Sequence, residues 1–148
     1  MATLRLEIVT PEGRAFPAKD AGGSPDAGDV DMVTIPGAEG ELGIMPQHAP
    51  LLTGIKPGEL RVLKNGKETF LAVGEGFVEV TQERVIVFTD MALEGAHIDE
   101  AAAQAAFDKA QEALKAQRLS DEEHATVQAS LEKSIAQLMI VKRRKQGH

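Results

Sequence analysis

The sequence predicts an all-β N-terminal sandwich or flattened barrel followed by a C-terminal antiparallel α-helical hairpin. Up to about Gly95, apolar and polar residues alternate with a period of two in short segments separated by turn signals. From Ile98 onward there is no proline, alanine is abundant and the apolar residues take a helical spacing. We therefore expect two domains, a sandwich over residues 1–95 and a helix-turn-helix over residues 96–148.

The strands are expected in short, hairpin-linked pairs. In the first, Leu4, Leu6 and Ile8 alternate with charged residues, as in a half-buried strand. Asn65-Gly66 predicts a type I′ turn, because both central residues of that turn need positive φ. Residues 20–29 are small, polar and rich in glycine, which indicates a flexible surface loop. The later strands are expected over residues 30–35, 60–63, 68–73, 76–80 and 84–89.

Capping residues place the two helices. Asp99 can cap a first helix that ends at about Gln117. Ser120 and Glu123 form a capping box that opens a second helix, which ends at about Arg144. The link between the helices is only a few residues long, so the helices are expected to be antiparallel.

The apolar faces of these helices are thin. On the second helix a stripe is expected from Val127, Leu131, Ile135 and Leu138. The first helix offers mainly alanine, at Ala102, Ala106, Ala110 and Ala113. Alanine buries little apolar area, so the hairpin is expected to be marginal alone and to gain stability by docking on another surface.

Composition and charge argue against several classes of protein and of binding site. A net charge of −7, five Phe and no Trp or Tyr argue against nucleic-acid binding, which recruits basic and aromatic surfaces. The absence of cysteine excludes disulfides and thiolate metal sites. Neither a signal peptide nor a membrane span of about 20 apolar residues is visible.

The charge is divided unevenly along the chain. Residues 98–148 hold eight acidic and eight basic residues, so the whole imbalance lies in the first 97 residues. Four cations, Lys142, Arg143, Arg144 and Lys145, end the second helix and are called the basic cluster below. Their placement at a helix C-terminus favours an interaction with the helix dipole, and the alternative is contact with an acidic partner.

No catalytic motif is present. The sequence has no phosphate-binding loop, no nucleophile elbow and no paired metal-ligating histidines. We expect no catalytic residue, no metal and no cofactor.

The segment Gly40–Gly58, GELGIMPQHAPLLTGIKPG, is unusual because three prolines and four glycines interrupt an apolar run. Prolines stiffen a segment and reduce the entropy that it loses on binding. His48 lies between two of the prolines but has no neighbouring nucleophile or carboxylate pair. A packing or interface role is therefore favoured over catalysis, and the chain has the features of an interaction module.

The run IPGAEGELGIMPQHAPLLTGIKPGELRV, residues 35–62, resembles the signature region of the epsilon subunit of F-type ATP synthases. TPEGRAF, FLAVGEGFVEV, VIVFTDMAL, IDE and SIAQL are also similar to that family. The resemblance covers essentially the whole chain except residues 20–29, which look longer than usual.

The resemblance implies a rotor subunit that couples c-ring rotation to ATP synthesis without catalytic residues of its own. Its partners would be the gamma subunit, the c-subunit ring and, when the hairpin extends, the alpha and beta subunits. The membrane would be contacted only through the complex, at the cytoplasmic face of the bacterial plasma membrane rather than in a plastid thylakoid. The implied contacts with the c ring and gamma are Glu41, Leu42, Ile44, Met45, His48 and Pro50.

The resemblance also implies a regulatory hairpin. Its extended form would block ATP hydrolysis, with the basic cluster facing acidic residues of the beta subunit. Some bacterial members bind ATP through an I/L-D-x-x-R-A motif, matched here by Ile98, Asp99 and Ala103, but Ala102 stands at the arginine position. ATP binding is therefore expected to be weak or absent. The alternative interpretation is a stand-alone ligand-binding sandwich with a helical appendage.

Overall fold

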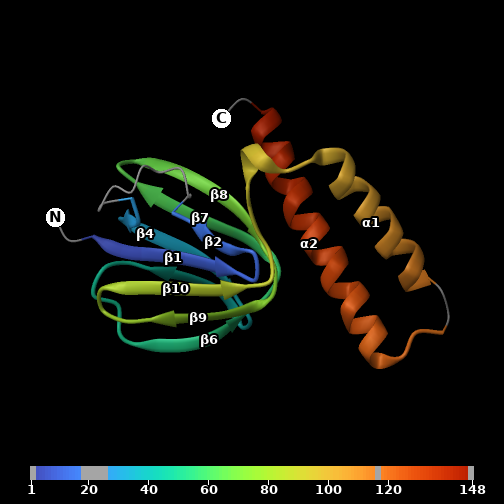
Figure 1. The fold of residues 1–148 in the computed structure, drawn as a ribbon, viewed down its shortest axis with the longest axis horizontal. Helices are drawn as coiled ribbons and strands as arrows, with labels where there is room; N and C mark the ends of the chain where they lie inside the picture. The colour runs from blue at the N-terminus through green and yellow to red at the C-terminus, as the bar shows by residue number, and fades with distance from the viewer. Residues whose placement is uncertain (1–2, 18–26, 116–117, 147–148) are drawn as a thin grey trace.

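The computed structural model describes residues 3–17, 27–115 and 118–146, and within them it confirms a β-sandwich followed by two helices. Figure 1 shows the helices side by side at one end of the sandwich. Residues 18–26, which make up most of the loop expected at 20–29, lie outside the described residues. The strands are β1 Leu4–Thr10, β2 Gly13–Phe16, β3 Asp29–Val30, β4 Met32–Gly37, β5 Gly40–Ile44, β6 Leu51–Ile55, β7 Gly58–Lys64, β8 Lys67–Val73, β9 Gly76–Val80, β10 Arg84–Thr89 and β11 Ala92–Glu94.

The strands form one continuous ladder that folds into two layers. Its order is β11-β8-β7-β4-β6-β9-β10-β1-β2, with β3 added on β1 and β5 added on β4. All of these pairs are antiparallel except β1 with β10. Only the pair Gly37–Ile55 joins β4 to β6, so the ladder bends there between the layers.

The sandwich has a core of its own. Alternate residues of its strands point inward, as the two-residue period predicts. Asn65 and Gly66 have φ of 52° and 78°, which confirms the turn expected between β7 and β8. The buried core consists of Leu4, Leu6, Ile8, Val30, Val33, Ile35, Ile44, Ile55, Leu60, Val62, Leu71, Val73, Val78, Val80, Val85 and Val87.

The helix caps predicted from the sequence are present. In α1, Glu100–Lys115, the backbone N–H of Ala102 donates to Asp99 Oδ1 over 3.1 Å. In α2, Asp121–Lys145, Ser120 accepts from the N–H of Glu123, whose side chain accepts from Ser120 N–H. These bonds satisfy donors that the first helical turn leaves unpaired.

The predicted faces of both helices need correction. Ala110 is buried in α1, but Ala102 and Ala106 are exposed, and Ala103 takes the second buried position. In α2, Ile135 is 39% exposed, whereas Ala136 and Ile140 are buried. Because α2 packs on the sandwich as well as on α1, its buried residues do not form the single stripe that a one-sided helix would show.

A second, smaller core joins α2 to the sandwich. It contains Ala72 of β8, Ile98 and three residues of α2, namely Ala136, Ile140 and Val141. Phe70, Met91 and Leu93 cover its edge. The alanines make this apolar contact small, so the polar contacts around it carry more of the docking energy than they would beside a larger core.

Candidate interaction surfaces

The Gly40–Gly58 segment folds as two short strands, β5 and β6, joined by the connecting segment 45–50. The prolines of this connecting segment, Pro46 and Pro50, lie outside the strands, and Pro57 lies between β6 and β7. These two strands were not predicted from the sequence. Strand pairing hides most of the backbone, and the prolines occupy positions where no ladder hydrogen bond is needed.

The six interface candidates are divided between the two ends of β5. Glu41 lies at its start, where its carboxylate pairs with Arg61 over 2.7 Å on the surface. Met45, His48 and Pro50 lie in the connecting segment beyond the other end of β5. Most of β5 therefore lies between Glu41 and His48 along the chain.

Within the connecting segment, backbone contacts fix the conformation. Gln47 N–H donates to the carbonyl of Gln82 over 2.8 Å, which ties the segment to the β9–β10 turn. His48 Nδ1 lies 2.8 Å from the carbonyl oxygen of Ala49, and Met45 is 60% exposed. Figure 1 shows the β9–β10 connection at the end of the sandwich opposite the helices.

The candidates Leu42, Ile44 and Pro50 differ in how much of their surface is exposed. Pro50 is exposed and Leu42 is half-buried. Ile44 has no exposed surface and belongs to the sandwich core. Ile44 therefore has no surface for a partner in this conformation, because it occupies the inward position at the end of β5.

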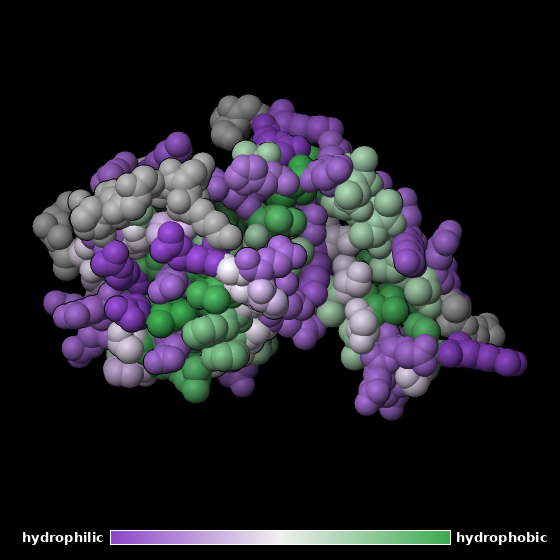
Figure 2. Space-filling model, viewed as in Figure 1, coloured by the Kyte–Doolittle hydropathy of each residue, from purple (hydrophilic) through white to green (hydrophobic). Residues whose placement is uncertain are grey.

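An apolar sheet face on β6, β9 and β10 escaped the sequence analysis. It consists of Leu52, Phe77, Ile86 and Phe88, with Leu52 68% and Phe77 47% exposed. Their strand neighbours Val78, Val85 and Val87 point into the core, so these four side chains point outward. Figure 2 shows apolar residues gathered on the sandwich among charged ones.

The register explains how this apolar sheet face is assembled. Phe77 is paired with Gly54 on one side and with Phe88 on the other, and the two rings stack with centroids 4.9 Å apart. Glu79 lies between Leu52 and Ile86, so one carboxylate interrupts the face. The sequence does contain one indication of this face, the run Val85–Phe88. Four consecutive apolar residues indicate a strand whose two faces are both covered.

Three residues of the basic cluster have partners within the chain, although Arg144 and Lys145 remain exposed. Arg143 Nη2 donates to Glu59 Oε1 and Oε2 over 3.0 and 2.9 Å. Arg144 donates to the carbonyls of Gly95 and Ile98, and Lys145 pairs with Glu100 over 2.7 Å. Lys142 is exposed. The cluster therefore has intramolecular partners in this conformation that sequence reasoning did not identify.

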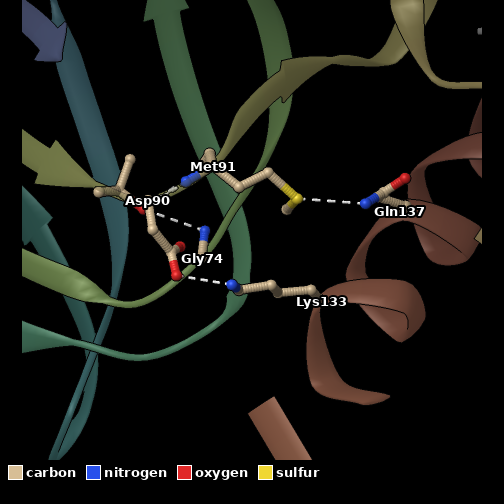
Figure 3. A network of polar contacts seen from close by, with 6 residues as sticks. Gly74, Asp90, Met91, Lys133 and Gln137 are labelled. Carbon is tan, nitrogen blue, oxygen red and sulfur yellow. Dashed lines mark hydrogen bonds and ion pairs between the residues drawn. The ribbon is translucent and has the colours of Figure 1, made fainter. Parts of the chain in front are cut away.

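A second group of contacts joins the middle of α2 to Asp90 and Met91, between β10 and β11. Lys133 Nζ pairs with Asp90 Oδ2 over 2.6 Å, and Gln137 Nε2 donates to Met91 Sδ over 3.2 Å. Figure 3 shows both contacts reaching from α2 to Asp90 and Met91, which lie beside Gly74. Together with the basic cluster, these residues hold the C-terminal half of α2.

The residues matching the nucleotide motif have structural partners. Asp99 caps α1, Ala103 is 2% exposed and Ile98 belongs to the second core. Ala102 is exposed and ends in a methyl group. A methyl group supplies no charge for a phosphate.

The described residues were also compared with the requirements of a metal site and of a membrane-spanning helix. Among residues 3–17, 27–115 and 118–146, no group of three His, Cys, Asp or Glu side chains could hold a metal ion. Neither helix, over its described residues, is long and apolar enough to cross a membrane.

Comparison with known proteins covers both parts of the chain. The family model for the ATP synthase delta/epsilon chain β-sandwich domain matches residues 3–95, and that for its long α-helix domain matches residues 97–142. The chain is 41% identical over 144 residues to the ATP synthase epsilon chain of Alkalilimnicola ehrlichii, covering 97% of this chain and 95% of the relative. It is 47% identical over 146 residues to that of Acidithiobacillus ferridurans, covering 98% and 96%.

Solved structures share the fold. A chain of the Euglena gracilis mitochondrial ATP synthase OSCP/F1/c-ring assembly has a TM-score of 0.71 at 22% identity, covering 92% of this chain and 79% of that chain. A chain of the Tetrahymena thermophila mitochondrial ATP synthase central stalk/c-ring has a TM-score of 0.58 at 12% identity, with 95% of each covered. The chain therefore belongs to the ATP synthase delta/epsilon family, as an epsilon chain, a non-catalytic subunit of the F-type ATP synthase.

Proposed function

We propose that this chain is the rotor subunit of the central stalk, joining the gamma subunit to the c-subunit ring so that ion flow drives ATP synthesis. The apolar sheet face is the observation that carries the proposal. Phe77 and Leu52 expose large side chains on adjacent strands of one sheet face, and such patches mark protein interfaces. Relatives that share the fold include a chain of a central stalk/c-ring assembly.

We assign the apolar sheet face to gamma and the two ends of β5 to further contacts with gamma and the c ring. The sandwich, residues 1–95, is the assembly domain in this proposal. The chain meets the membrane through the complex, as a peripheral component at its cytoplasmic face. The hairpin, residues 96–148, is the regulatory domain, which extends toward the alpha and beta subunits and inhibits ATP hydrolysis.

The experiment that tests assembly is co-purification. A tagged full chain expressed with gamma and the c subunits is expected to retain both through membrane solubilisation and gel filtration. A chain that elutes alone while gamma and the c ring remain associated would contradict the proposal.

Glu41→Lys is expected to weaken coupling without unfolding the subunit. Glu41 pairs with Arg61 on the surface, and exposed ion pairs contribute only about 0–1 kcal/mol to stability. A lysine there reverses the charge that we assign to a c-ring contact. The measurement is ATP-driven proton pumping divided by ATP hydrolysis in membranes that carry the variant.

The matched control for that substitution is Arg61→Met, which removes the same ion pair and keeps Glu41. Coupling close to the unsubstituted level is expected for the control. Equal losses in both variants, or a melting temperature that falls sharply in Glu41→Lys, would assign Glu41 a structural role.

The isolated chain is expected to bind ATP weakly or not at all. Ala102 supplies no guanidinium, and Asp99 already accepts from the first turn of α1. Isothermal titration of the full chain with ATP is expected to give no saturable heat at micromolar concentrations. Ala102→Arg is the informative comparison, and micromolar affinity in the unsubstituted chain would overturn the expectation.

A further inference from the structure

The strongest unassigned feature is the environment of Arg143 at the C-terminal end of α2. Its guanidinium contacts the Glu59 carboxylate through Nη2 and lies over the Phe70 ring, 4.3 Å from the centroid. Glu59 lies on β7 and Phe70 on the adjacent β8. Residues 84 positions apart thus meet on the outer face of the β7–β8 pair, where α2 docks.

Burial distinguishes this contact from the other ion pairs of the hairpin. The Glu59 side chain is only 16% exposed, whereas Asp90, the partner of Lys133, is 47% exposed. Lys145 and Glu100 are 63% and 45% exposed, and they join α2 to α1 rather than to the sandwich. A shielded carboxylate depends on its partner more strongly than an exposed one.

The contact also carries a cost. Arg143 Nε is buried and has no hydrogen-bond partner among the described residues. When the helix leaves the sandwich, this unsatisfied donor can hydrogen-bond to water. The free energy gained offsets part of the free energy lost when the docking contacts break. The apolar contact beneath it is small, because Ala72 and Ala136 supply much of it. The docked and undocked states therefore differ little in free energy, and one ion pair contributes much of that difference.

We propose that Arg143 and Glu59 form a latch that sets the equilibrium between the docked and the undocked hairpin. While Glu59 holds Arg143, this guanidinium is not available to an acidic partner elsewhere. When the hairpin lifts, Arg143 is released together with the rest of α2. The latch itself is a property of the isolated chain, and only its regulatory consequence rests on the proposed function.

The test is a distance measurement on the full chain. The sequence contains no cysteine, so spin labels can be placed at Glu79→Cys on the exposed face of β9 and Ala125→Cys on α2. Pulsed dipolar spectroscopy then reports the sandwich-to-hairpin distance. The docked structure predicts one main distance, and undocking adds a broad, different population.

Arg143→Met is expected to raise the ratio of undocked to docked molecules about tenfold, because it leaves Glu59 shielded and unpaired. Lys133→Met, whose partner Asp90 is the more exposed carboxylate, is expected to change that ratio less. Lys145→Met is the matched control and is expected to leave the distance distribution unchanged, since its partner Glu100 moves with the hairpin.

A charge exchange completes the test. Glu59→Arg combined with Arg143→Glu is expected to bring the distribution closer to the unsubstituted chain than either single substitution does. An unchanged distribution in Arg143→Met, or a double variant whose shift equals the sum of the single shifts, would overturn the latch. Neither result would bear on whether the chain binds gamma, so failure of the latch and failure of the proposed function are distinguishable.

Discussion

Phe77→Glu is expected to raise the Kd for the gamma subunit about 100-fold or more. Phe77 lies at the middle of the apolar sheet face, stacked on Phe88 and paired with Gly54. Exposed aromatic residues at the centre of an interface are worth about 2–4 kcal/mol, and a buried unpaired carboxylate adds a further cost. Titration of purified gamma into the full chain measures the effect.

Two comparisons make that result specific to the apolar sheet face. Lys67→Glu, on the opposite layer of the sandwich, is expected to leave the affinity for gamma nearly unchanged. Met45→Glu changes a still more exposed side chain in the connecting segment. If Met45→Glu abolished binding while Phe77→Glu did not, gamma would bind the connecting segment, and the assignment of the apolar sheet face would be wrong.

Ending the chain after Gly95 is expected to leave a folded sandwich and to raise ATP hydrolysis by the assembled complex severalfold. The sandwich core contains no residue of the hairpin, so its cooperative unfolding should survive the deletion. The deletion uncovers Ala72 together with Phe70 and Leu93, so some loss of solubility is expected. The measurement is steady-state hydrolysis by the complex reconstituted with either the full or the shortened chain.

A matched control separates inhibition from assembly. The shortened chain carrying Phe77→Glu is expected to fail to join the complex, whereas the shortened chain alone should join it. Unchanged hydrolysis with a fully incorporated shortened chain would show that the hairpin is not inhibitory.

The sequence predicted the local features of this fold well. The strand alternation at Leu4, Leu6 and Ile8, the turn at Asn65-Gly66 and the capping box at Ser120 are all present. Each of these depends on residues close together in the chain. Their physical causes, side-chain period, positive φ and helix capping, therefore act without knowledge of the tertiary structure.

The sequence could not predict which faces meet. The exposure of Ile135 and the burial of Ile140 depend on where α2 crosses β7 and β8, which no local pattern specifies. Likewise, Arg143 contacts Glu59 because the hairpin folds back on the sandwich, which no local sequence pattern indicates. The apolar sheet face was visible as the run Val85–Phe88, but its neighbours Leu52 and Phe77 come from other strands and meet only through the register.

The central claim is that one chain joins the rotor through its sandwich and inhibits hydrolysis when its hairpin lifts. A reversible lock tests it most directly. A Cβ placed at Gly95 would lie 2.9 Å from Ile140 Cγ2, so Gly95→Cys with Ile140→Cys can join the docked hairpin to the sandwich in a chain that has no other cysteine.

ATP hydrolysis of the complex carrying this pair is then measured after oxidation and again after reduction in the same sample. The oxidised complex, with its hairpin held down, is expected to hydrolyse ATP faster, and reduction is expected to restore inhibition. Ile140→Cys alone should show no such response. Equal rates before and after reduction, with the disulfide verified, would contradict the claim that lifting of the hairpin inhibits the enzyme.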